Sequence, residues 1–456
     1  MDAWRDVVFS VPYEIAAVRP LRQTTPGERL ETLRAAHFNT ELIPQDMIYV
    51  DLSTDSGVSS ISTNQLLALN GGSSADPGMG LAAEGSRAFA RLAREVEHVF
   101  GFPFMVPTTQ GRSAERIWSK ISIRPGSFVC GNMLFPSTRT HIEMNGAKLI
   151  DVVCDGAHEL MSDAPFKGNV DVDKLTAAIA EYGAEKMSCV YVEVALNACG
   201  GHPVSLGNLA EVRAIATAHK IPLFLDASRI LENSFLVKQR EAAHHRRTVL
   251  DIVRETCALA DAVTMSALKD FLVPGGGLIL TRDESAYRKA SMQSFLDGVQ
   301  LTAQGMDLVA AALEDIFAAE AYLAERVEQV HYLWRRFKNS VPVVQPACGH
   351  AVFIDLNAFL ADVPAQQFPA EALAAFIYQT SGVRITKGPP AAPSQAARGA
   401  QLLRLAVPAR KYRRGHLDDV AESILYAHAH RGEIRGLKKL EDPGRSKYDP
   451  VHFIEL

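Results

Sequence analysis

Two residues of opposite charge could form a catalytic pair, Asp226 and Lys269. Asp226 ends the apolar run in IPLFLDASR, and Lys269 lies in TMSALKDFLVPGGG, before a glycine-rich turn. In a parallel sheet, side chains at the carboxyl ends of strands face the ligand crevice. A lysine there could bind the aldehyde of pyridoxal phosphate as an imine, while a carboxylate keeps the ring nitrogen protonated. Such a pair also occurs for purely structural reasons, so this role stays open at this point.

A second candidate is the tripeptide Gln110, Gly111 and Arg112, in VPTTQGRSAERIW. The pattern predicts a loop that enters a helix, whose first backbone N–H groups and positive dipole end suit a phosphate. The guanidinium of Arg112 could add a two-point charge pair. An ordinary helix start would contain the same residues, so this motif alone does not define a phosphate site.

The elements around these motifs alternate between short β-branched runs and amphipathic helical patterns. Expected strands are 128–130, 148–153, 187–194, 222–226, 262–265 and 277–280, and expected helices are 84–100, 172–182, 206–219 and 248–259. This alternation predicts an α/β domain with a mostly parallel sheet covered by helices. The pattern over 305–338 predicts one long connecting helix, and mixed strand and helix patterns after it predict a smaller α+β domain.

The composition of the 456-residue chain is that of a globular protein. The hydrophobic fraction is 47%, the charged fraction is 22% and the net charge is −5. These values argue against disorder and against a nucleic-acid partner bound by a broad basic face. No apolar stretch is long enough to predict a membrane span. The six cysteines are sparse and show neither CxxC nor metal-ligand spacing, so we expect no metal site, reduced thiols and a cytoplasmic location.

Long runs across most of the chain resemble the tryptophanase and tyrosine phenol-lyase family of β-eliminating lyases. They are DLSTDSG (51–57), PTTQGRSAE (107–115), GNMLFPSTRTHIEMNGA (131–147), PFKGNVDVDKL (165–175), GGHPVSLGNL (200–209), LDASRILENSF (225–235), MSALKD (265–270), GGG (275–277), GHAVFIDL (349–356) and LLRLAVPARKY (402–412). The resemblance implies a pyridoxal-phosphate enzyme of fold type I, with a large domain and a smaller α+β domain. Together these runs are far more specific than any single motif.

The resemblance also implies roles for individual residues. Lys269 is similar to the Schiff-base lysine that moves the α-proton, and Asp226 to the partner of the ring nitrogen. The other positions implied are Asn197 and Arg229 near the phenolic oxygen, Phe135 stacked on the ring, Gln110, Gly111, Arg112 and Ser266 around the phosphate, and Arg404 with Thr54 and Ser56 at the substrate carboxylate. An arginine fork at the carboxylate would also orient the Cα–H bond for abstraction.

Several positions depart from the family's pattern. The family has a tyrosine that resembles the general acid for the leaving group, and this chain has Ala83 at the matching position. Leu268 stands where the family has a second lysine. We identify no counterpart of the family's acidic residue for a monovalent cation, so the resemblance does not extend to potassium dependence. Tyr448 and Asp449 replace an aromatic pair and could contact a polar leaving group, although an ordinary surface tail is an alternative. Lys387 is the nearest basic residue to the position of a leaving-group arginine.

These departures bear on the leaving group. Phenol and indole leave as carbon groups that must be protonated, whereas a thiol with a pKa of about 8.5 leaves with little acid help. We therefore expect β-elimination from a cysteine S-conjugate, giving a thiol, pyruvate and ammonia. Decarboxylative oxidative deamination and an aminotransferase-type reaction remain alternatives, as does a non-catalytic homologue.

The expected organisation follows from the same resemblance. Residues 1–50 would pack with the small domain, 51–300 would form the cofactor-binding domain, 301–330 the connecting helix and 331–456 the small domain. The family's sites are shared between subunits, so we expect a homodimer or homotetramer with shared active sites. Its partners would be a small-molecule amino-acid substrate, with neither nucleic acid nor membrane.

Overall fold

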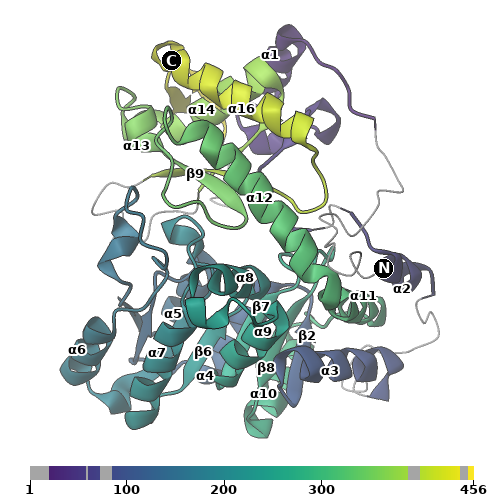
Figure 1. Cartoon of the computed structure of the whole chain (residues 1–456), viewed down its shortest axis with the longest axis vertical. Helices are drawn as coiled ribbons and strands as arrows, with labels where there is room; N and C mark the ends of the chain where they lie inside the picture. The colour runs from purple at the N-terminus through teal and green to yellow at the C-terminus, as the bar shows by residue number, and fades with distance from the viewer. Residues whose placement is uncertain (1–19, 58–59, 72–84, 389–400, 442–449) are drawn as a thin grey trace, which may run out of the picture. The chain divides into compact units, whose positions relative to one another are not determined.

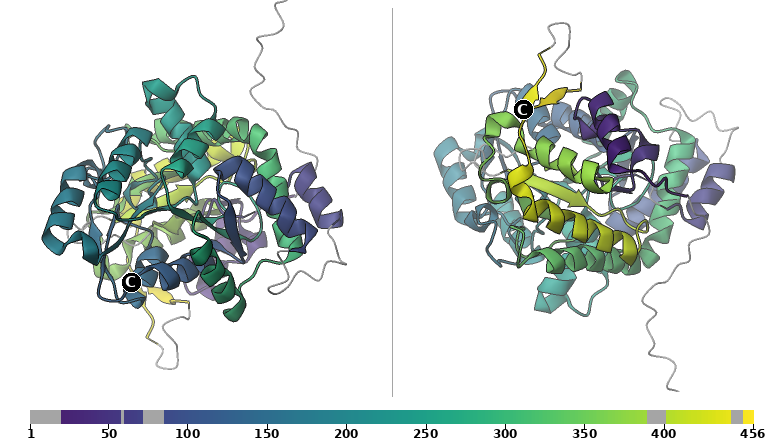
Figure 2. Two further views of the ribbon diagram at one scale, coloured as in Figure 1. Left: turned by 90° about the horizontal axis from the view of Figure 1, so that it is seen from below. Right: turned by 90° about the horizontal axis from the view of Figure 1, so that it is seen from above.

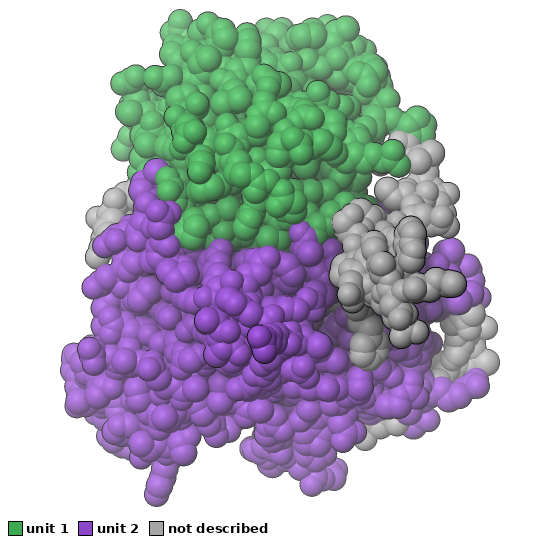
Figure 3. Space-filling model, viewed as in Figure 1, with its two compact units in different colours: residues 1–55, 325–456 green, residues 56–324 purple. Residues whose placement is uncertain are grey.

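A computed structural model describes residues 20–57, 60–71, 85–388, 401–441 and 450–456. The chain divides into two compact units (Figure 3). Unit 1 comprises Met1–Asp55 and Glu325–Leu456, and unit 2 comprises Ser56–Ala324. The finer domain boundaries expected from the sequence stay a prediction. Within the described residues, no helix is both long and apolar enough to cross a membrane.

Unit 2 is built on a sheet of seven described strands in the order β2-β8-β7-β6-β5-β3-β4. Figure 1 labels β2, β6, β7 and β8 of this sheet. The strands are β2 (Phe104–Thr108), β3 (Phe128–Gly131), β4 (Lys148–Asp151), β5 (Met187–Glu193), β6 (Leu223–Asp226), β7 (Ala262–Ser266) and β8 (Gly277–Thr281). Within this sheet, β8 runs opposite to the other six strands. The expected α/β fold with a mostly parallel sheet is therefore confirmed.

Helices lie on both faces of this sheet (Figures 1 and 2). The described helices of unit 2 are α2 (Thr63–Gly71), α3 (Arg87–Phe100), α4 (Gly111–Ser122), α5 (Pro136–Met144), α6 (Val172–Tyr182), α7 (Leu206–Ala218), α8 (Ile230–Arg240), α9 (Val249–Ala258), α10 (Glu284–Leu296) and α11 (Ala303–Glu314). All of β5 is buried, as expected of a strand covered on both sides. On one face, Trp118 of α4 packs edge-on against Phe224 of β6 with ring centroids 5.2 Å apart. This contact seats α4 over the strand that ends at Asp226.

Unit 1 is a smaller α+β assembly. Its helices are α1 (Pro26–Ala35), α13 (Leu356–Phe359), α14 (Pro369–Ser381) and α16 (Arg414–Ala429), and its strands are β1 (Val50–Asp51), β9 (Ala351–Asp355), β10 (Val383–Arg384), β11 (Thr386–Lys387), β12 (Leu402–Ala406), β13 (Leu437–Lys439) and β14 (Phe453–Glu455). Strand β12 pairs antiparallel with both β9 and β11. Buried apolar residues from α1, α14, α16 and these strands form one core cluster.

One expected element needs correction, and one strand was not expected. The pattern over 305–338 is not one helix, because α11 ends at Glu314, a short 3₁₀ turn covers Asp315–Ala318, and α12 (Ala319–Phe337) then begins. Apolar periodicity continues through such a turn, so it does not reveal the break. Strand β2 was not expected because Pro107 interrupts it. It lies at the edge of the sheet, where a strand tolerates proline.

Candidate active site

Asp226 is the last residue of β6, and its side chain is buried. Its Oδ1 accepts hydrogen bonds from the Ser228 backbone N–H at 3.0 Å and from the Ser228 hydroxyl at 2.7 Å. Burial raises the pKa of Asp226, while Ser228, Arg229 and Lys269 act in the opposite direction. The carboxyl group is therefore held at a strand end by local donors and neighbouring cations, as a partner for a protonated ring nitrogen must be.

Lys269 lies three residues beyond β7, in the turn that precedes β8. Its Nζ donates a hydrogen bond to the hydroxyl of Ser56, and the Gly57 N–H bonds to the carbonyl of Leu268 at 2.8 Å. At the end of β7, the Ser266 N–H donates to the Ser228 hydroxyl oxygen at 3.1 Å. Ser228 thus joins the ends of β6 and β7, which brings the Asp226 carboxylate and the Lys269 turn into one site.

The N-terminus of α4 lies against the same strand end. Gln110 is its N-cap residue and makes no side-chain capping bond. A Cβ placed on Gly111 would lie 2.7 Å from the Cβ of Ser266, so only glycine allows this approach of helix and strand. The first N–H groups of a helix have no partner within it and favour an anion. Arg112 follows Gly111 and is an exposed cation. Three of the four residues expected around the phosphate, Gln110, Gly111 and Arg112, are therefore at this helix end, and the fourth, Ser266, packs against Gly111.

Three other expected cofactor contacts occur at the same edge of the sheet. Asn197 is buried at the start of a 3₁₀ turn after β5, and its N–H donates to Glu193 Oε1 at 3.2 Å. Arg229 is the buried N-cap residue of α8, with Nε 4.0 Å from the Glu232 carboxylate. Phe135 is the N-cap residue of α5 and follows β3, the parallel neighbour of β5. The parallel strands therefore bring these side chains to one edge, as the fold predicts.

Two acidic side chains in this region were missed by the sequence analysis, Glu115 and Glu193. Both are buried. Burial and the charge of Asp226 raise the pKa of Glu115 to about 7, although the Ser137 hydroxyl donates to it at 2.5 Å. Burial and Asp226 also raise the pKa of Glu193 to about 8. The Asp226 site is therefore rich in carboxyl groups, which must share protons near neutral pH.

The sequence did contain a signal for Glu193. It is the one charged residue in the largely apolar run MSCVYVEVAL, which directly precedes Asn197. A carboxyl group in a strand that is covered on both faces costs free energy unless it is paired or protonated. Glu115 gave a weaker signal, because a glutamate in the first turns of a helix is ordinary.

The residues expected to bind substrate divide between the units. Ser56 belongs to unit 2, beside Lys269, whereas Thr54 and Arg404 belong to unit 1. Within unit 1, Arg404 Nη2 donates to the backbone carbonyl of Ser53 at 3.1 Å, directly before Thr54. The guanidinium therefore reaches the segment that carries Thr54.

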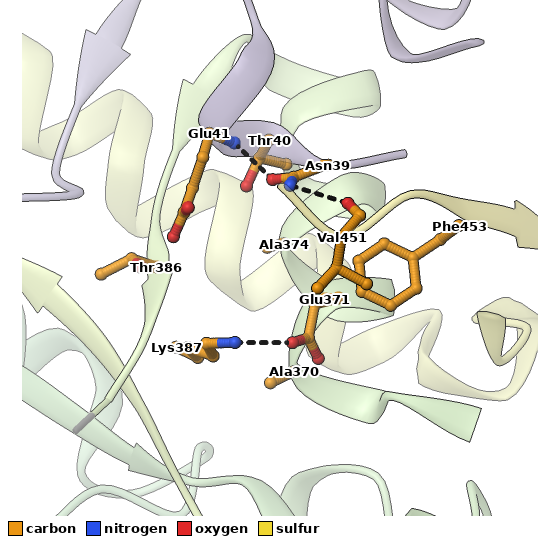
Figure 4. Close-up of a pocket in the computed structure, with 10 residues that line it drawn as sticks. All are labelled: Asn39, Thr40, Glu41, Ala370, Glu371, Ala374, Thr386, Lys387, Val451 and Phe453. Atoms are coloured by element: carbon orange, nitrogen blue, oxygen red, sulfur yellow. Dashed lines mark hydrogen bonds and ion pairs between the residues drawn. The ribbon is translucent and has the colours of Figure 1, made fainter. Parts of the chain in front are cut away.

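Lys387 is placed differently from Arg404. In the β11–β12 pairing, Arg404 is opposite Thr386, and Lys387 is opposite Leu403. Because side chains alternate along a strand, Lys387 and Arg404 leave opposite faces of the sheet. Lys387 instead bonds to Glu371 at 3.2 Å beside a small pocket of about 80 Å³ (Figure 4). Among the other expected positions, Ala83, Tyr448 and Asp449 lie outside the described residues.

The chemistry of this donor set fits pyridoxal 5′-phosphate. Lys269 supplies an amine, Asp226 a buried carboxylate, and the Gly111 end of α4 a surface for a phosphate where no Cβ intrudes. The chain is similar in fold to solved pyridoxal-phosphate enzymes. A serine palmitoyltransferase from Sphingomonas wittichii matches with a TM-score of 0.65 and 14% identity, over 90% of this chain and 97% of that one. A structure of SPT with PLP matches with a TM-score of 0.62 and 13% identity, over 89% and 97%. The protein therefore has the fold of the fold type I pyridoxal-phosphate enzymes.

Sequence comparison defines the family within that fold. The family model described as beta-eliminating lyase matches residues 51–423. Proteins named tyrosine phenol-lyase are 39% identical in Pasteurella multocida (97% of this chain and 98% of the relative) and 38% identical in Symbiobacterium sp. (98% of each). Another from Intrasporangium calvum is 40% identical, over 93% and 91%. The chain belongs to the β-eliminating lyase family. It is a divergent member, and its cofactor is pyridoxal 5′-phosphate.

Proposed function

We propose that this enzyme eliminates the β-substituent of a cysteine S-conjugate and releases a thiol, pyruvate and ammonia. The observation that carries the proposal is the retention of Lys269 and Asp226 in a chain that has Ala83 at the expected position of the leaving-group acid. The base for the α-proton is kept, whereas the acid for a carbon leaving group is not. A thiolate needs that acid least, since a thiol has a pKa of about 8.5.

The proposed roles are supported by the contacts around Lys269 and Asp226 in unit 2 and, for Arg404 and Thr54 in unit 1, by the family resemblance. When bound, pyridoxal phosphate withdraws electrons from the substrate Cα, which acidifies its proton and labilises the β-substituent. Lys269 Nζ would accept the α-proton, and the hydroxyl of Ser56 would orient this amine. Asp226 would hold the proton on the ring nitrogen, and the α4 N-terminus would bind the phosphate. Arg404 and Thr54 would bind the substrate carboxylate.

A second candidate function is cleavage of tyrosine to phenol. It is favoured by the relatives named tyrosine phenol-lyase, which are 35–40% identical to this chain. This reaction breaks a carbon–carbon bond, and its ring carbon must be protonated as the bond breaks. The described residues of the Lys269 site would then need a donor from elsewhere in the chain, for which Tyr448 is the candidate from the sequence.

A product screen separates the candidates. The purified holoenzyme would be incubated with a panel of S-alkyl, S-aryl and S-hydroxyalkyl cysteines and, in parallel, with tyrosine and tryptophan. Equal amounts of pyruvate and free thiol from at least one cysteine conjugate, at a kcat/KM at least tenfold above that for tyrosine, support the proposal. Phenol from tyrosine as the preferred product overturns it in favour of the second candidate.

The same screen covers the remaining alternatives. Carbon dioxide with peroxide would indicate decarboxylative oxidation, and pyridoxamine phosphate would indicate half-transamination. The absence of any product across both panels, with cofactor bound, would indicate a non-catalytic homologue. Each of these results rejects β-elimination.

We also propose that the enzyme is a homodimer or homotetramer with shared sites, as the family resemblance implies. Light scattering coupled to size-exclusion chromatography of the holoenzyme tests this assembly. A monomer at micromolar concentration would contradict it.

A further inference from the structure

Glu193 and Asp226 are register partners at the carboxyl ends of the parallel strands β5 and β6. Residues paired in this way project from the same face of a sheet, so the two carboxyl groups are neighbours. Glu193 is 5% exposed and Asp226 is 4% exposed. Two adjacent carboxylates with so little access to water cannot both be ionised, so one of them must hold a proton near neutral pH.

The hydrogen bonds indicate which carboxyl group holds the proton. Asp226 Oδ1 accepts two hydrogen bonds from Ser228 and lies near the charges of Arg229 and Lys269. Glu193 Oε1 accepts the Asn197 N–H, while its Oε2 is buried and meets no donor in hydrogen-bond geometry among the described residues. The Phe135 N–H also acts on this carboxyl group, but more weakly than the Asn197 N–H and Arg229. An ionised oxygen without a donor is costly to bury. The charge therefore belongs on Asp226 and the proton on Glu193.

Glu193 also holds the turn that carries Asn197. Asn132 brackets the Glu193 backbone, because its Oδ1 accepts the Glu193 N–H at 2.9 Å and its Nδ2 donates to the Glu193 carbonyl at 3.0 Å. From this fixed position the Glu193 side chain reaches forward to the Asn197 N–H. Asn197 is the residue expected near the phenolic oxygen of the cofactor, so one side chain links that contact to the ring-nitrogen carboxylate.

We propose that Glu193 is a positioning residue: as a neutral acid it leaves the charge on Asp226 and anchors the turn that carries Asn197. This inference rests on the proposed roles of Asp226 and Asn197. Burial and then the charge of Asp226 raise the pKa of Glu193 to about 8, against the lowering effects of the Asn197 N–H, Arg229 and the Phe135 N–H. The groups that set the titration are Asp226 on β6, Arg229 at the start of α8, and Glu115 on α4, which interacts with Asp226.

The first test uses the apoprotein and needs no activity. Glu193→Gln keeps the oxygen that accepts the Asn197 N–H but can no longer ionise. A glutamate whose folded pKa is raised lowers stability progressively as pH rises from its ordinary pKa of 4.5 to its folded pKa. The difference in Tm between Glu193→Gln and the wild type should therefore increase by about 2–5 °C in favour of the variant between pH 5 and pH 8, and it should stay constant above pH 8. Glu211→Gln, at an exposed site on α7, should run parallel to the wild type. Parallel curves for Glu193→Gln would overturn the assignment of the proton.

The second test measures the anchoring. Glu193→Gln should bind pyridoxal phosphate within about threefold of the wild-type Kd, whereas Glu193→Ala should bind about tenfold more weakly because the Asn197 turn loses its hydrogen bond. Amide hydrogen exchange at Asn197 in the apoprotein should accelerate in Glu193→Ala and not in Glu193→Gln. Equal exchange at Asn197 in both variants would overturn the anchoring role. If Glu193→Ala does not fold, faster exchange in Glu193→Gln than in the wild type would overturn it. Failure of the wild type to bind the cofactor would instead reject the proposed cofactor site. The two failures can be told apart, because the Tm test on the apoprotein does not depend on cofactor binding.

Discussion

Ser228 donates both its hydroxyl and its backbone N–H to Oδ1 of Asp226, at 2.7 and 3.0 Å. The same hydroxyl oxygen accepts the N–H of Ser266, which ends the neighbouring strand. One small side chain therefore sets the direction of the buried carboxylate and fixes the spacing of β6 and β7. The residues around it follow from this arrangement, since Ser266 touches Gly111 and the Lys269 turn begins directly beyond Ser266.

Ser228→Ala should weaken cofactor binding. It removes one of two donors to the Asp226 carboxylate and leaves the Ser266 N–H without its acceptor, so we expect a stability loss of about 1–2 kcal/mol. The pKa of Asp226 should rise further, and the Kd for pyridoxal phosphate should increase about tenfold. Urea unfolding of the apoprotein and fluorescence titration with the cofactor measure both effects. Ser228→Thr keeps the hydroxyl and should recover most of the affinity; an unchanged Kd in Ser228→Ala would contradict the role of this bond.

Gly111→Ala should disturb the phosphate site specifically. The new Cβ would lie 2.7 Å from the Cβ of Ser266, so the start of α4 must move away from β7 at a cost of about 1–3 kcal/mol. We expect the Kd for pyridoxal phosphate to rise more than tenfold. Gly207→Ala is the matched control, because that helical glycine has open space around its Cβ position. It should leave the Kd unchanged and stabilise the protein by about 0.5–1 kcal/mol, and similar Kd values for the two variants would contradict the assignment.

The sequence predicted the layered α/β fold and the strand ends that carry Asp226 and Ser266, because apolar runs and motif residues are local signals. It could not predict that Glu193 lies beside Asp226, since that relation depends on the register between β5 and β6. Ser228 was overlooked for a similar reason, as its bond to the Ser266 N–H spans 38 residues of sequence. The break between α11 and α12 was missed because helical periodicity does not report a single 3₁₀ turn.

Borohydride reduction should attach pyridoxal phosphate to Lys269. The amine of this residue is held by the Ser56 hydroxyl within the same unit as Asp226, so it is the nucleophile that the site presents to an aldehyde. Peptide mass spectrometry of the reduced holoenzyme should find the label on the peptide that contains Lys269. Lys269→Ala should carry no label and should lose more than 10³-fold in kcat/KM. Lys289→Ala, at an exposed site on α10, should be labelled and active like the wild type, whereas a label on any other lysine would contradict the assignment.

Asp51→Asn should destabilise unit 1 in a pH-dependent way. Burial alone would raise the pKa of Asp51, but hydrogen bonds from Arg384 and Ser53 outweigh it and lower the pKa to about 2. The Asp51–Arg384 pair is nearly buried, and Arg384 Nη2 lies 2.6 Å from Asp51 Oδ2 while its Nε lies 3.1 Å from Oδ1. The pair joins β1 to β10. It stands at the start of the segment that Arg404 contacts. Removing the charge leaves the Arg384 cation without its carboxylate partner, so we expect a loss of about 3 kcal/mol at pH 7. A carboxylate with a lowered folded pKa contributes stability that is complete above its unfolded pKa of about 3.8 and disappears as pH falls through 2.

Urea unfolding at pH 7 and at successively lower pH should therefore show the wild type and Asp51→Asn converging in acid. Asp362→Asn, at an exposed site, should stay within about 0.5 kcal/mol of the wild type throughout, and an equally small effect of Asp51→Asn at pH 7 would show that the Arg384 pair does not stabilise this part of the protein.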